Sequence, residues 1–433
     1  MHVLVIGSGG REHALVWKIR QSKRVSALSC APGNPGIAMI ARCVPLKPTD
    51  VHGLAAYAAE NAVDLTVVGP EQPLAEGIVD LFASRGLRIF GPTRRAAELE
   101  WSKAFAKEFM ARNHVPTATY RTFTLAQQDE AADYLCNCPV PVVLKADGLA
   151  AGKGVLVCES RESALSGLDE MFGQKAFGTA GETVVIEEFL RGVEASVFAI
   201  SDGKDFLTLA PAQDHKRIND GDRGKNTGGM GAYAPAPMAT TEVLRQVEDH
   251  IIGPTLRGMA AGGRPYRGCL YVGLMLTADG PKVVEFNCRF GDPETQAVLP
   301  LLDADLVEIL TAAADGNLAS LDIPRSRLVR GHAACVVLAS GGYPDTYPTG
   351  LEISGLTSAS GLPGVVVFHA GTRADGDRVL TSGGRVLGVT AVSPEGTLRE
   401  ALESAYAAVR LIRFEGMHYR HDIGQKAFAP FSH

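Results

Sequence analysis

The sequence predicts an α/β and α+β multidomain protein, in which an N-terminal domain with a parallel sheet precedes mixed α+β regions. The chain has 433 residues, more than the roughly 250–300 over which one hydrophobic core usually extends. Short apolar runs alternate with helical segments near the N-terminus, which is typical of βαβ units. Beyond residue 102, several strands follow one another directly, which indicates a different topology.

The N-terminal domain is expected to span residues 1–102. It begins with the strand "HVLVI", and the turn "GSGGREH" opens the first helix. Further strands are predicted at 25–30, 64–69 and 87–92, and further helices at 50–62 and 73–86.

The second domain is expected to span residues 103–325. The patterns predict one long helix at 93–115, a β-hairpin at 141–158, a helix at 160–174, two strands within 183–201, helical structure at 241–262, a hairpin at 270–287 and a helix at 303–317. Residues 211–237 are predicted to form a long polar loop, either a mobile or binding loop or a solvated surface excursion.

The third domain is expected to be a small α+β module spanning residues 326–433. Strands are predicted within 331–344, 364–372 and 385–392, followed by a helix at 398–412.

Composition excludes several classes of protein. The formal net charge of −6 gives no general electrostatic reason to bind nucleic acid. No apolar run approaches the roughly 20 residues of a membrane helix, and the N-terminus is not a signal peptide. Among the eight cysteines, only Cys136 and Cys138 are closely spaced, so neither a disulfide framework nor a paired zinc motif is expected. We expect a cytoplasmic protein that binds neither nucleic acid nor membranes.

The turn "GSGGREH" (residues 7–13) follows a strand and opens a helix, where backbone N–H groups can hold a phosphate. The dinucleotide fingerprint fails, because Glu12 stands where a third glycine is needed and the second strand ends without an acidic residue. A phosphate-bearing small substrate fits better than NAD, with a tight packing turn as the alternative.

The stretch "KADGLAAGKGV" (residues 145–155) places two lysines around small, flexible residues. It does not match the Walker A spacing, and Gly154 follows Lys153 where Ser or Thr is required. Backbone amides of such a loop can approach phosphates, while Lys145 on the strand supplies a fixed positive charge. We favour a loop that covers a triphosphate over a plain β-hairpin.

Acidic residues also accompany two predicted strands. In "IEEFLRGVEAS" (186–196), Glu187 and Glu188 alternate faces, so one should point inward; Glu194 follows as a candidate ribose contact, with a solvated strand end as the alternative. In "KVVEFNCRFGDPETQ" (282–296), Glu285, Asn287 and Arg289 share one face of a strand. Two oxygen ligands beside a cation suit Mg²⁺ with bound phosphates, and the uncharged Asn287 argues against a salt-bridge cluster.

Taken in order, these stretches resemble the sequences of the phosphoribosylamine–glycine ligase family, a family of ATP-grasp enzymes of purine biosynthesis. The resemblance covers almost the whole chain, and its most specific motifs are "NTGGMGAY" and "RFGDPETQ". It implies an ATP-grasp body with a mobile lid at about 120–190. It also implies ligation of glycine to 5-phosphoribosylamine through glycyl phosphate, giving glycinamide ribonucleotide, ADP and phosphate. The expected cofactors are ATP and Mg²⁺ or Mn²⁺, and the expected state is a monomer, with a weak dimer as the alternative.

The resemblance also assigns roles to individual residues. Catalytic roles fall to Arg289, Lys216 and Asp214, and metal binding falls to Glu285 and Asn287. The expected ATP contacts are Lys103, Lys145, Gly152, Lys153, Gly154, Glu187, Glu188, Phe189, Leu190, Glu194 and Asn226. The expected substrate contacts are Gly9, Gly10, Glu71, Thr227, Gly228, Gly229, Asp292 and Glu294.

The chain departs from the family pattern at several positions. Lys225 stands where the family commonly has proline, Trp101 replaces a small residue, and "DIGQKA" replaces an aromatic and basic ending. The strand "YVGLML" offers no second metal carboxylate. Two other functions compete: a biotin-carboxylase-like ATP-grasp enzyme, and a nucleotide-binding regulatory module without catalysis. The complete set of Lys145, Glu285, Asn287 and Arg289 argues against the second.

Overall fold

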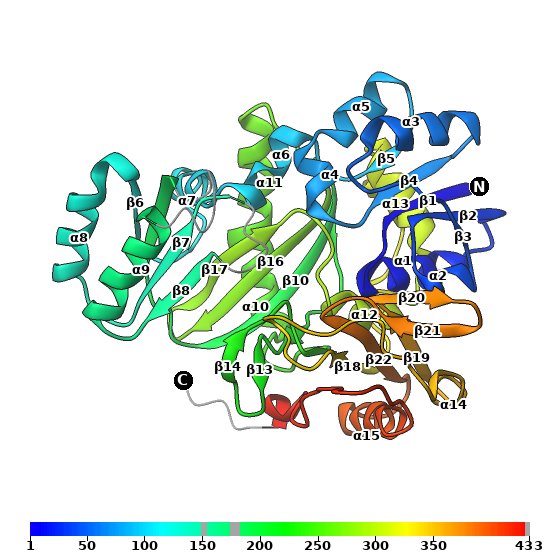
Figure 1. Cartoon of the computed structure of the whole chain (residues 1–433). Helices are drawn as coiled ribbons and strands as arrows, with labels where there is room; N and C mark the ends of the chain where they lie inside the picture. Colours follow the sequence, from blue (N-terminus) through cyan, green and yellow to red (C-terminus); the bar gives the residue numbers. More distant parts are fainter. Residues whose placement is uncertain (149–153, 174–181, 429–433) are drawn as a thin grey trace.

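The computed structural model describes residues 1–148, 154–173 and 182–428. Figure 1 shows a small lobe built from the middle of the chain beside a larger body that contains the N-terminal and C-terminal regions. A sheet formed by β10 (Val193–Asp202), β16 (Arg267–Thr277) and β17 (Gly280–Asn287) lies between them.

The N-terminal region forms the predicted parallel sheet, with strand order β3-β2-β1-β4-β5. Successive side chains of β1 enter different hydrophobic clusters, Val3 and Val5 one and Leu4 and Ile6 another. An uninterrupted apolar run is typical of a parallel strand that is buried on both faces. The strands are β1 (His2–Gly7), β2 (Ala27–Pro32), β3 (Arg42–Cys43), β4 (Leu65–Val68) and β5 (Ile89–Phe90).

Helices connect these strands. The predicted helix at 73–86 is divided at Gly77, whose φ of +86° is favoured by glycine. The helices are α1 (Gly10–Arg20), α2 (Pro35–Ala38), α3 (Val51–Glu60), α4 (Glu71–Ala75) and α5 (Ile78–Ser84).

The single long helix predicted at 93–115 is wrong. The chain forms α6 (Arg94–Trp101) and α7 (Lys103–Arg112), with extended backbone at Ser102 between them. The Ser102 side chain caps α7 by accepting a hydrogen bond from the Phe105 amide. Asp147, far away in sequence, accepts hydrogen bonds from the Ser102 hydroxyl and the Ala104 amide, so a tertiary contact fixes the break.

The small lobe is a four-stranded sheet with order β6-β9-β7-β8, accompanied by α8 (Gln128–Asn137) and α9 (Arg161–Gly173). Its strands are β6 (Tyr120–Thr124), β7 (Val142–Ala146), β8 (Val155–Cys158) and β9 (Thr183–Glu188). The predicted hairpin is confirmed, because β7 and β8 pair antiparallel. The lobe has a hydrophobic cluster of its own, with buried members between Phe123 and Ile186.

The central sheet has strand order β11-β10-β16-β17, in which β11 is Phe206–Thr208. The predicted hairpin at 270–287 is confirmed by the antiparallel pairing of β16 and β17. The helices of this region are α10 (Thr241–Val247), a π-helical turn (Glu248–Ile252), α11 (Gly253–Ala261), α12 (Glu294–Val298) and α13 (Leu306–Asp315).

The prediction that 211–237 lacks regular structure is wrong. This segment contains β12 (Gln213–Asp214), β13 (Arg217–Asn219), β14 (Arg223–Asn226) and β15 (Gly231–Ala234). Strand β15 pairs with β18 (His332–Ala339) in a sheet with order β12-β15-β18-β22-β19. The proposed boundary at 325/326 therefore separates strands that hydrogen-bond to each other.

The C-terminal region contributes the rest of that sheet. It contains β19 (Val365–His369), β20 (Thr372–Asp375), β21 (Arg378–Thr381), β22 (Arg385–Ser393), α14 (Leu356–Ser360) and α15 (Leu398–Val409). Within the described residues, no helix is long and apolar enough to cross a membrane.

Candidate active site

The predicted metal ligands lie at the end of β17, where a β-bulge sets the direction of their side chains. Gly273 pairs with Glu285 and Leu274 with Val283, which leaves Val284 without a partner in the ladder. Beyond the bulge, half-buried Glu285, Asn287 and Arg289 alternate with buried neighbours. The three side chains therefore share one face, as the period of two predicts.

Glu285 is surrounded by positive charge. Burial opposes its ionisation, yet Lys103, Lys216, Lys145 and Arg289 hold its pKa below the ordinary value. The Asn287 side-chain oxygen is 3.2 Å from Arg289 Nη2, which donates to it. An ionised carboxylate and an amide oxygen are hard ligands that suit Mg²⁺, and the surrounding cations favour a metal that arrives with phosphate.

Arg289 is held by two carboxylates. Its Nη2 lies 3.1 Å from Glu100 Oε1, and its Nε lies 3.3 Å from Glu71 Oε2. Although burial alone would lower it, these carboxylates raise the pKa of Arg289 above its ordinary value. The arginine is thus a permanent cation in a fixed orientation beside Glu285 and Asn287.

Sequence reasoning missed Glu100. It lies on α6, and its second oxygen accepts a hydrogen bond from the Cys288 amide at 2.7 Å. Burial raises the pKa of Glu100, while Arg289 opposes that rise. The available signal was an acidic residue on the apolar face of α6, beside buried Ala96 and Leu99.

Glu187 lies between two lysines in the small lobe. Its carboxylate oxygens are each 3.0 Å from a cation, Oε2 from Lys107 Nζ and Oε1 from Lys145 Nζ. Lys145 also donates to the Val284 carbonyl at 2.9 Å, which joins the small lobe to the β17 bulge. Burial lowers the pKa of Lys107 to about 8, against the opposing effect of Glu187.

Glu187 and Glu188 lie on opposite faces of β9. The prediction that Glu187 or Glu188 points inward is confirmed, because Glu187 is buried and Glu188 is exposed. Glu188 accepts from the Thr119 amide at 3.0 Å. Lys107 was missed because its position on α7 resembles that of an ordinary surface lysine.

The remaining residues proposed for ATP are spread around this region. Lys103 begins α7 and donates to the Glu100 carbonyl at 2.9 Å. Phe189 and Leu190 follow β9 and are half-buried, and Gly154 is buried just before β8. Gly152 and Lys153 lie outside the described residues.

A second charged group lies across a small cavity from Glu285. Glu194, Lys216, Tyr271, Val284 and Glu285 are among the residues that line the cavity. Lys216 Nζ is 2.7 Å from Asp214 Oδ1 and 3.8 Å from Glu194 Oε2. Burial alone would lower the pKa of Lys216, but these acids raise it well above its ordinary value.

Glu294 is a buried acid next to this group. Its Oε1 accepts hydrogen bonds from the Tyr271 hydroxyl at 3.0 Å and from the Ser196 hydroxyl at 3.3 Å. Burial and the nearby charge of Asp214 raise the pKa of Glu294 to about 7, against the opposing effect of Lys216.

Arg385, which sequence reasoning also missed, joins Asp292 to the segment after β14. Its Nη2 lies 3.3 Å from Asp292 Oδ1, and its Nη1 donates to the carbonyls of Asp292 and Gly228. A side chain at Gly229 (φ +110°) would collide with Pro293, so glycine permits this close approach. Thr227 closes the base of the hairpin by donating to the Lys216 carbonyl from its amide and its hydroxyl, both at 2.8 Å.

The turn at Gly9 and Gly10 is engaged by the protein itself. The Gly9 amide donates to Glu12 Oε2 at 2.6 Å, and the Arg11 amide donates to Asp292 Oδ2 at 3.4 Å. A Cβ at Gly10 would lie 2.5 Å from Gln296 Nε2, so glycine also allows α1 to approach α12. A phosphate at this helix end would meet two carboxylates, which makes the turn a poorer phosphate site than the sequence indicated.

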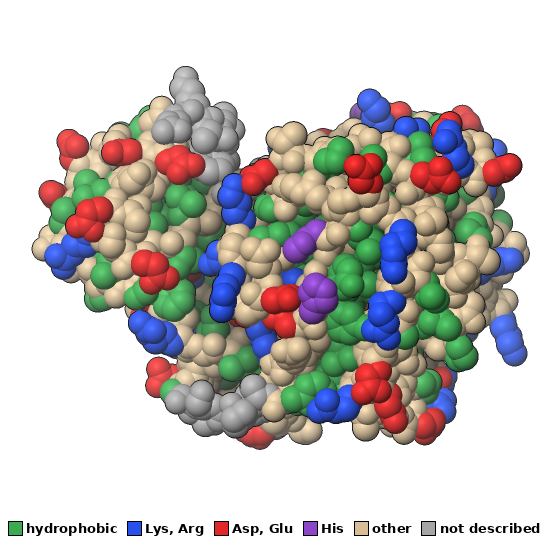
Figure 2. Space-filling model, turned by 60° about the horizontal axis from the view of Figure 1, so that its bottom comes forward, with side chains coloured by type: hydrophobic (Ala, Val, Ile, Leu, Met, Phe, Trp, Pro, Cys, Tyr) green, Lys and Arg blue, Asp and Glu red, His purple; other side chains and the backbone are tan. Residues whose placement is uncertain are grey.

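The charged side chains thus form two groups: Lys107, Glu187, Lys145, Arg289 and Glu100 in one, and Glu194, Lys216, Asp214 and Glu294 in the other. Glu285 lies beside both. In the space-filling view, basic and acidic side chains gather along the boundary between the small lobe and the larger body (Figure 2). A carboxylate flanked by lysines and an arginine, between a small lobe and a larger body, is the arrangement of an ATP-grasp ligase.

Comparison with known proteins gives the family. Three family models match in order: the N domain of phosphoribosylglycinamide synthetase at residues 1–100, its ATP-grasp (A) domain at 101–295 and its C domain at 333–426. The chain belongs to this family, the phosphoribosylamine–glycine ligases.

Individual proteins agree with the family models. The phosphoribosylamine–glycine ligase of Chlorobaculum tepidum is 52% identical over 431 residues, covering 99% of this chain and 100% of that protein. The crystal structure of phosphoribosylamine–glycine ligase from Thermotoga maritima has a TM-score of 0.83 at 33% identity, covering 98% of this chain and 100% of that one. A biotin carboxylase from Campylobacter jejuni, at 15% identity and a TM-score of 0.72 over 96% of this chain and 92% of its own, shares the fold alone.

Proposed function

We propose that the chain joins glycine to 5-phosphoribosylamine with cleavage of ATP to ADP and phosphate. The observation that carries this proposal is the ionised Glu285 among Lys103, Lys145, Lys216 and Arg289. Such a group can hold a triphosphate and a carboxylate substrate close together, as phosphoryl transfer to a carboxylate requires.

The reaction has two steps. A glycine carboxylate oxygen attacks the γ-phosphorus of ATP, which releases ADP and gives glycyl phosphate. The amine nitrogen of phosphoribosylamine then attacks the carbonyl carbon, phosphate leaves, and the nitrogen loses a proton as the amide forms. Activation is needed because a carboxylate oxygen is a poor leaving group until it carries a phosphoryl group.

Lys103 and Lys145 would contact the ATP phosphates, and Glu187 to Leu190 would border the adenine. The pairing of Glu187 with Lys107 and Lys145 supports a positioning role for its carboxylate, which leaves the backbone after β9 to face the base. Glu194 would contact the ribose. Glu285 and Asn287 would hold Mg²⁺, which when bound neutralises charge on the phosphates.

Glycine would bind between the two groups of charged residues. Arg289 has the permanent charge and the planar fork needed to hold a carboxylate and then the transferring phosphoryl group. Lys216 and Asp214, with Asn226 to Gly229, would border glycine and the γ-phosphate, and Glu294 would lie near the glycine. Asp292 would support this region through Arg385.

Phosphoribosylamine would enter from the N-terminal region, at Gly9, Gly10 and Glu71. Because carboxylates engage the helix end at Gly9, we assign this turn to the hydroxyl and amine groups of the substrate and not to its phosphate. Glu71, held by Arg289, would link the amine substrate to the acyl phosphate centre.

The test is ADP release that depends on glycine and on phosphoribosylamine generated in the same reaction. Release of ADP with bicarbonate and biotin, but none with glycine, would contradict the proposal and favour the biotin-carboxylase-like alternative.

A further inference from the structure

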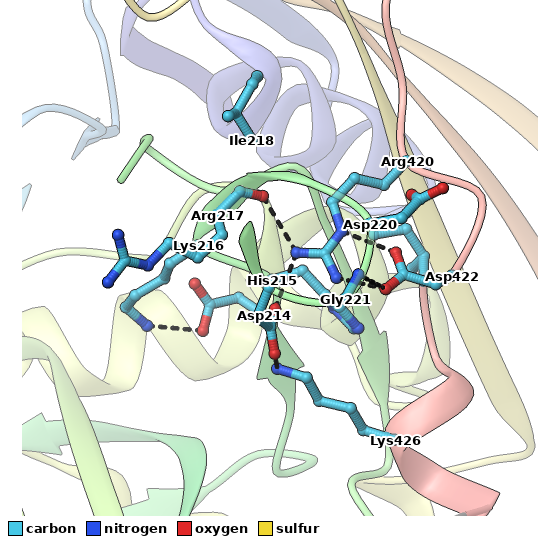
Figure 3. A network of polar contacts seen from close by, with 12 residues as sticks. Asp214, His215, Lys216, Arg217, Ile218, Asp220, Gly221, Arg420, Asp422 and Lys426 are labelled. Atoms are coloured by element: carbon cyan, nitrogen blue, oxygen red, sulfur yellow. Dashed lines mark hydrogen bonds and ion pairs between the residues drawn. The ribbon is translucent and has the colours of Figure 1, made fainter. Parts of the chain in front are cut away.

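The C-terminal segment Arg420–Lys426 packs against the β13–β14 hairpin, more than 190 positions away in sequence. Figure 3 shows Arg420, Asp422 and Lys426 gathered around the turn of the hairpin, with Asp214 and Lys216 at its base. This segment includes "DIGQK", from the stretch that departs from the family pattern, and the proposed chemistry gives it no role. We call residues 420–426 the C-terminal brace.

Arg420 is the centre of the brace. It is fully buried, and its guanidinium contacts β13 and the turn of the hairpin: Nη1 donates to the Arg217 carbonyl at 3.0 Å and to Asp222 Oδ1 at 2.8 Å. Its Nε and Nη2 donate to the two oxygens of Asp422 at 2.7 and 2.6 Å. Asp422 also accepts from the Gly221 amide at 2.8 Å, and Lys426 lies 2.5 Å from Asp222.

Further contacts fix the same hairpin. The His421 amide donates to Asp220 Oδ1 at 2.8 Å, and His418 Nε2 lies 2.9 Å from the Ile218 carbonyl. The Gly424 amide donates to Nε2 of fully buried His215 at 3.3 Å. Burial lowers the pKa of His215 to about 4, so the ring is neutral and Nε2 is free to accept.

The hairpin connects these contacts to the active site. His215 stands between Asp214 and Lys216, and the Lys216 carbonyl accepts the two hydrogen bonds of Thr227 that close the hairpin base. An open pocket lined by Ile218, Asn219, Lys225, Tyr343 and His418 lies against another part of the hairpin. The hairpin faces solvent there, and the polar contacts of the brace restrain it.

We propose that Arg420 is a positioning residue, which through the hairpin sets the place of Lys216 and of Thr227 to Gly229 for glycine and the γ-phosphate. The inference rests on the proposed function and adds to it a residue that touches no substrate. A rigid support of this kind matters because a displacement of about 1 Å at a reacting group can cost roughly 100-fold in rate.

The experiment compares Arg420→Met with the wild-type full-length enzyme. We expect kcat/KM for glycine to fall about 10- to 100-fold. Binding of ADP with Mg²⁺, measured by calorimetry, should stay within about 3-fold, because ADP lacks the γ-phosphate that the hairpin would contact. Asp222→Asn, which weakens the contacts with Arg420 and Lys426 at a partly exposed position, should show the same pattern more weakly. It provides the test if Arg420→Met does not fold.

Two control variants separate positioning from general stability. Val389→Ala creates a cavity in β22 of the C-terminal sheet, away from the hairpin, and should lower Tm without a selective effect on glycine. Asp345→Asn removes an exposed ion pair between Lys225 of the same hairpin and the neighbouring loop, and should leave kcat/KM unchanged.

The proposal is overturned if folded Arg420→Met and Asp222→Asn keep wild-type kcat/KM for glycine. It is also overturned if their loss of kcat/KM matches that of Val389→Ala at equal Tm, or if their affinity for ADP falls as much as their kcat/KM for glycine. Failure of the proposed function looks different, because the wild-type enzyme itself would then release no ADP with glycine.

Discussion

Arg289 and Glu100 form an ion pair that joins the end of β17 to α6, with Nη2 and Oε1 3.1 Å apart. Glu100 also accepts a hydrogen bond from the backbone amide of Cys288, the residue before the arginine. The carboxylate therefore fixes both the backbone and the side chain at the position assigned to the transferring phosphoryl group.

Glu100→Gln should lower kcat about 10-fold or more, because the arginine loses the charge that orients it while the amide keeps an oxygen for Cys288. Steady-state kinetics with each substrate varied would measure the loss. Glu98→Gln is the matched control, since Glu98 lies on the same helix as Glu100 but pairs with Arg264, away from the site. Equal kinetics for the two variants would refute the role of Glu100.

Glu294 should make stability depend on pH. Its pKa is raised to about 7, so the folded protein binds a proton that the unfolded chain has lost between about pH 4.5 and 7. The stability contributed by protonation is complete below pH 4.5 and is lost as pH rises through 7. Glu294→Gln stays neutral, so its stability relative to wild type should improve by on the order of 1–3 kcal/mol between pH 5 and pH 8.

Chemical denaturation at both pH values would measure this change for Glu294. Glu308→Gln, at a more exposed position on α13, is the control and should show little difference. A constant free-energy difference between Glu294→Gln and wild type across this pH range would contradict the prediction.

The contact between the N-terminal and C-terminal regions should be sensitive to acid. The His369 amide donates to His13 Nδ1 at 2.8 Å, and both rings are buried. Burial lowers the pKa of His13 to about 3 and that of His369 to about 4. Because both folded values lie below 6.5, the stability they contribute is present above pH 6.5 and is lost as pH falls toward 4.

His13→Asn should reduce this loss, since an asparagine oxygen can replace Nδ1 as acceptor but does not titrate. We expect the free energy of unfolding to fall on the order of 1–2 kcal/mol less than in wild type between pH 7 and pH 5. His52→Asn, at an exposed position on α3, is the control. If the free energy of unfolding changes with pH equally in His13→Asn and wild type, the histidine contact is excluded as a source of acid sensitivity.

The sequence predicted those parts of the site that depend on local periodicity. Glu285, Asn287 and Arg289 share a face because a strand alternates, and the hairpin predicted at 141–158 follows from two apolar runs joined by a Gly-rich stretch. The bulge at Val284 was not predictable, because it depends on the register with β16. The substrates were predicted from the resemblance in motifs and not from periodicity.

The errors arose where distant segments decide local structure. Ser102 breaks a helical pattern because Asp147 binds there, and β15 became a strand because β18, about a hundred residues later, pairs with it. Lys107 and Glu100 were missed for a similar reason. Each role depends on a partner that is distant in sequence, Glu187 for Lys107 and Arg289 for Glu100.

Glu285→Ala should lower turnover far more than stability. Removing the carboxylate takes away the proposed metal ligand and leaves Lys103, Lys145, Lys216 and Arg289 without their shared anion. We expect kcat to fall about 100-fold or more and the Mg²⁺ concentration needed for half-maximal rate to rise. The free energy of unfolding should change by no more than about 2 kcal/mol, because the side chain is half-buried and other acids remain beside the cations. Asp279→Ala, in the exposed turn of the same hairpin, is the control for both measurements. Near-normal turnover of Glu285→Ala at limiting Mg²⁺ would show that Glu285 is not a metal ligand.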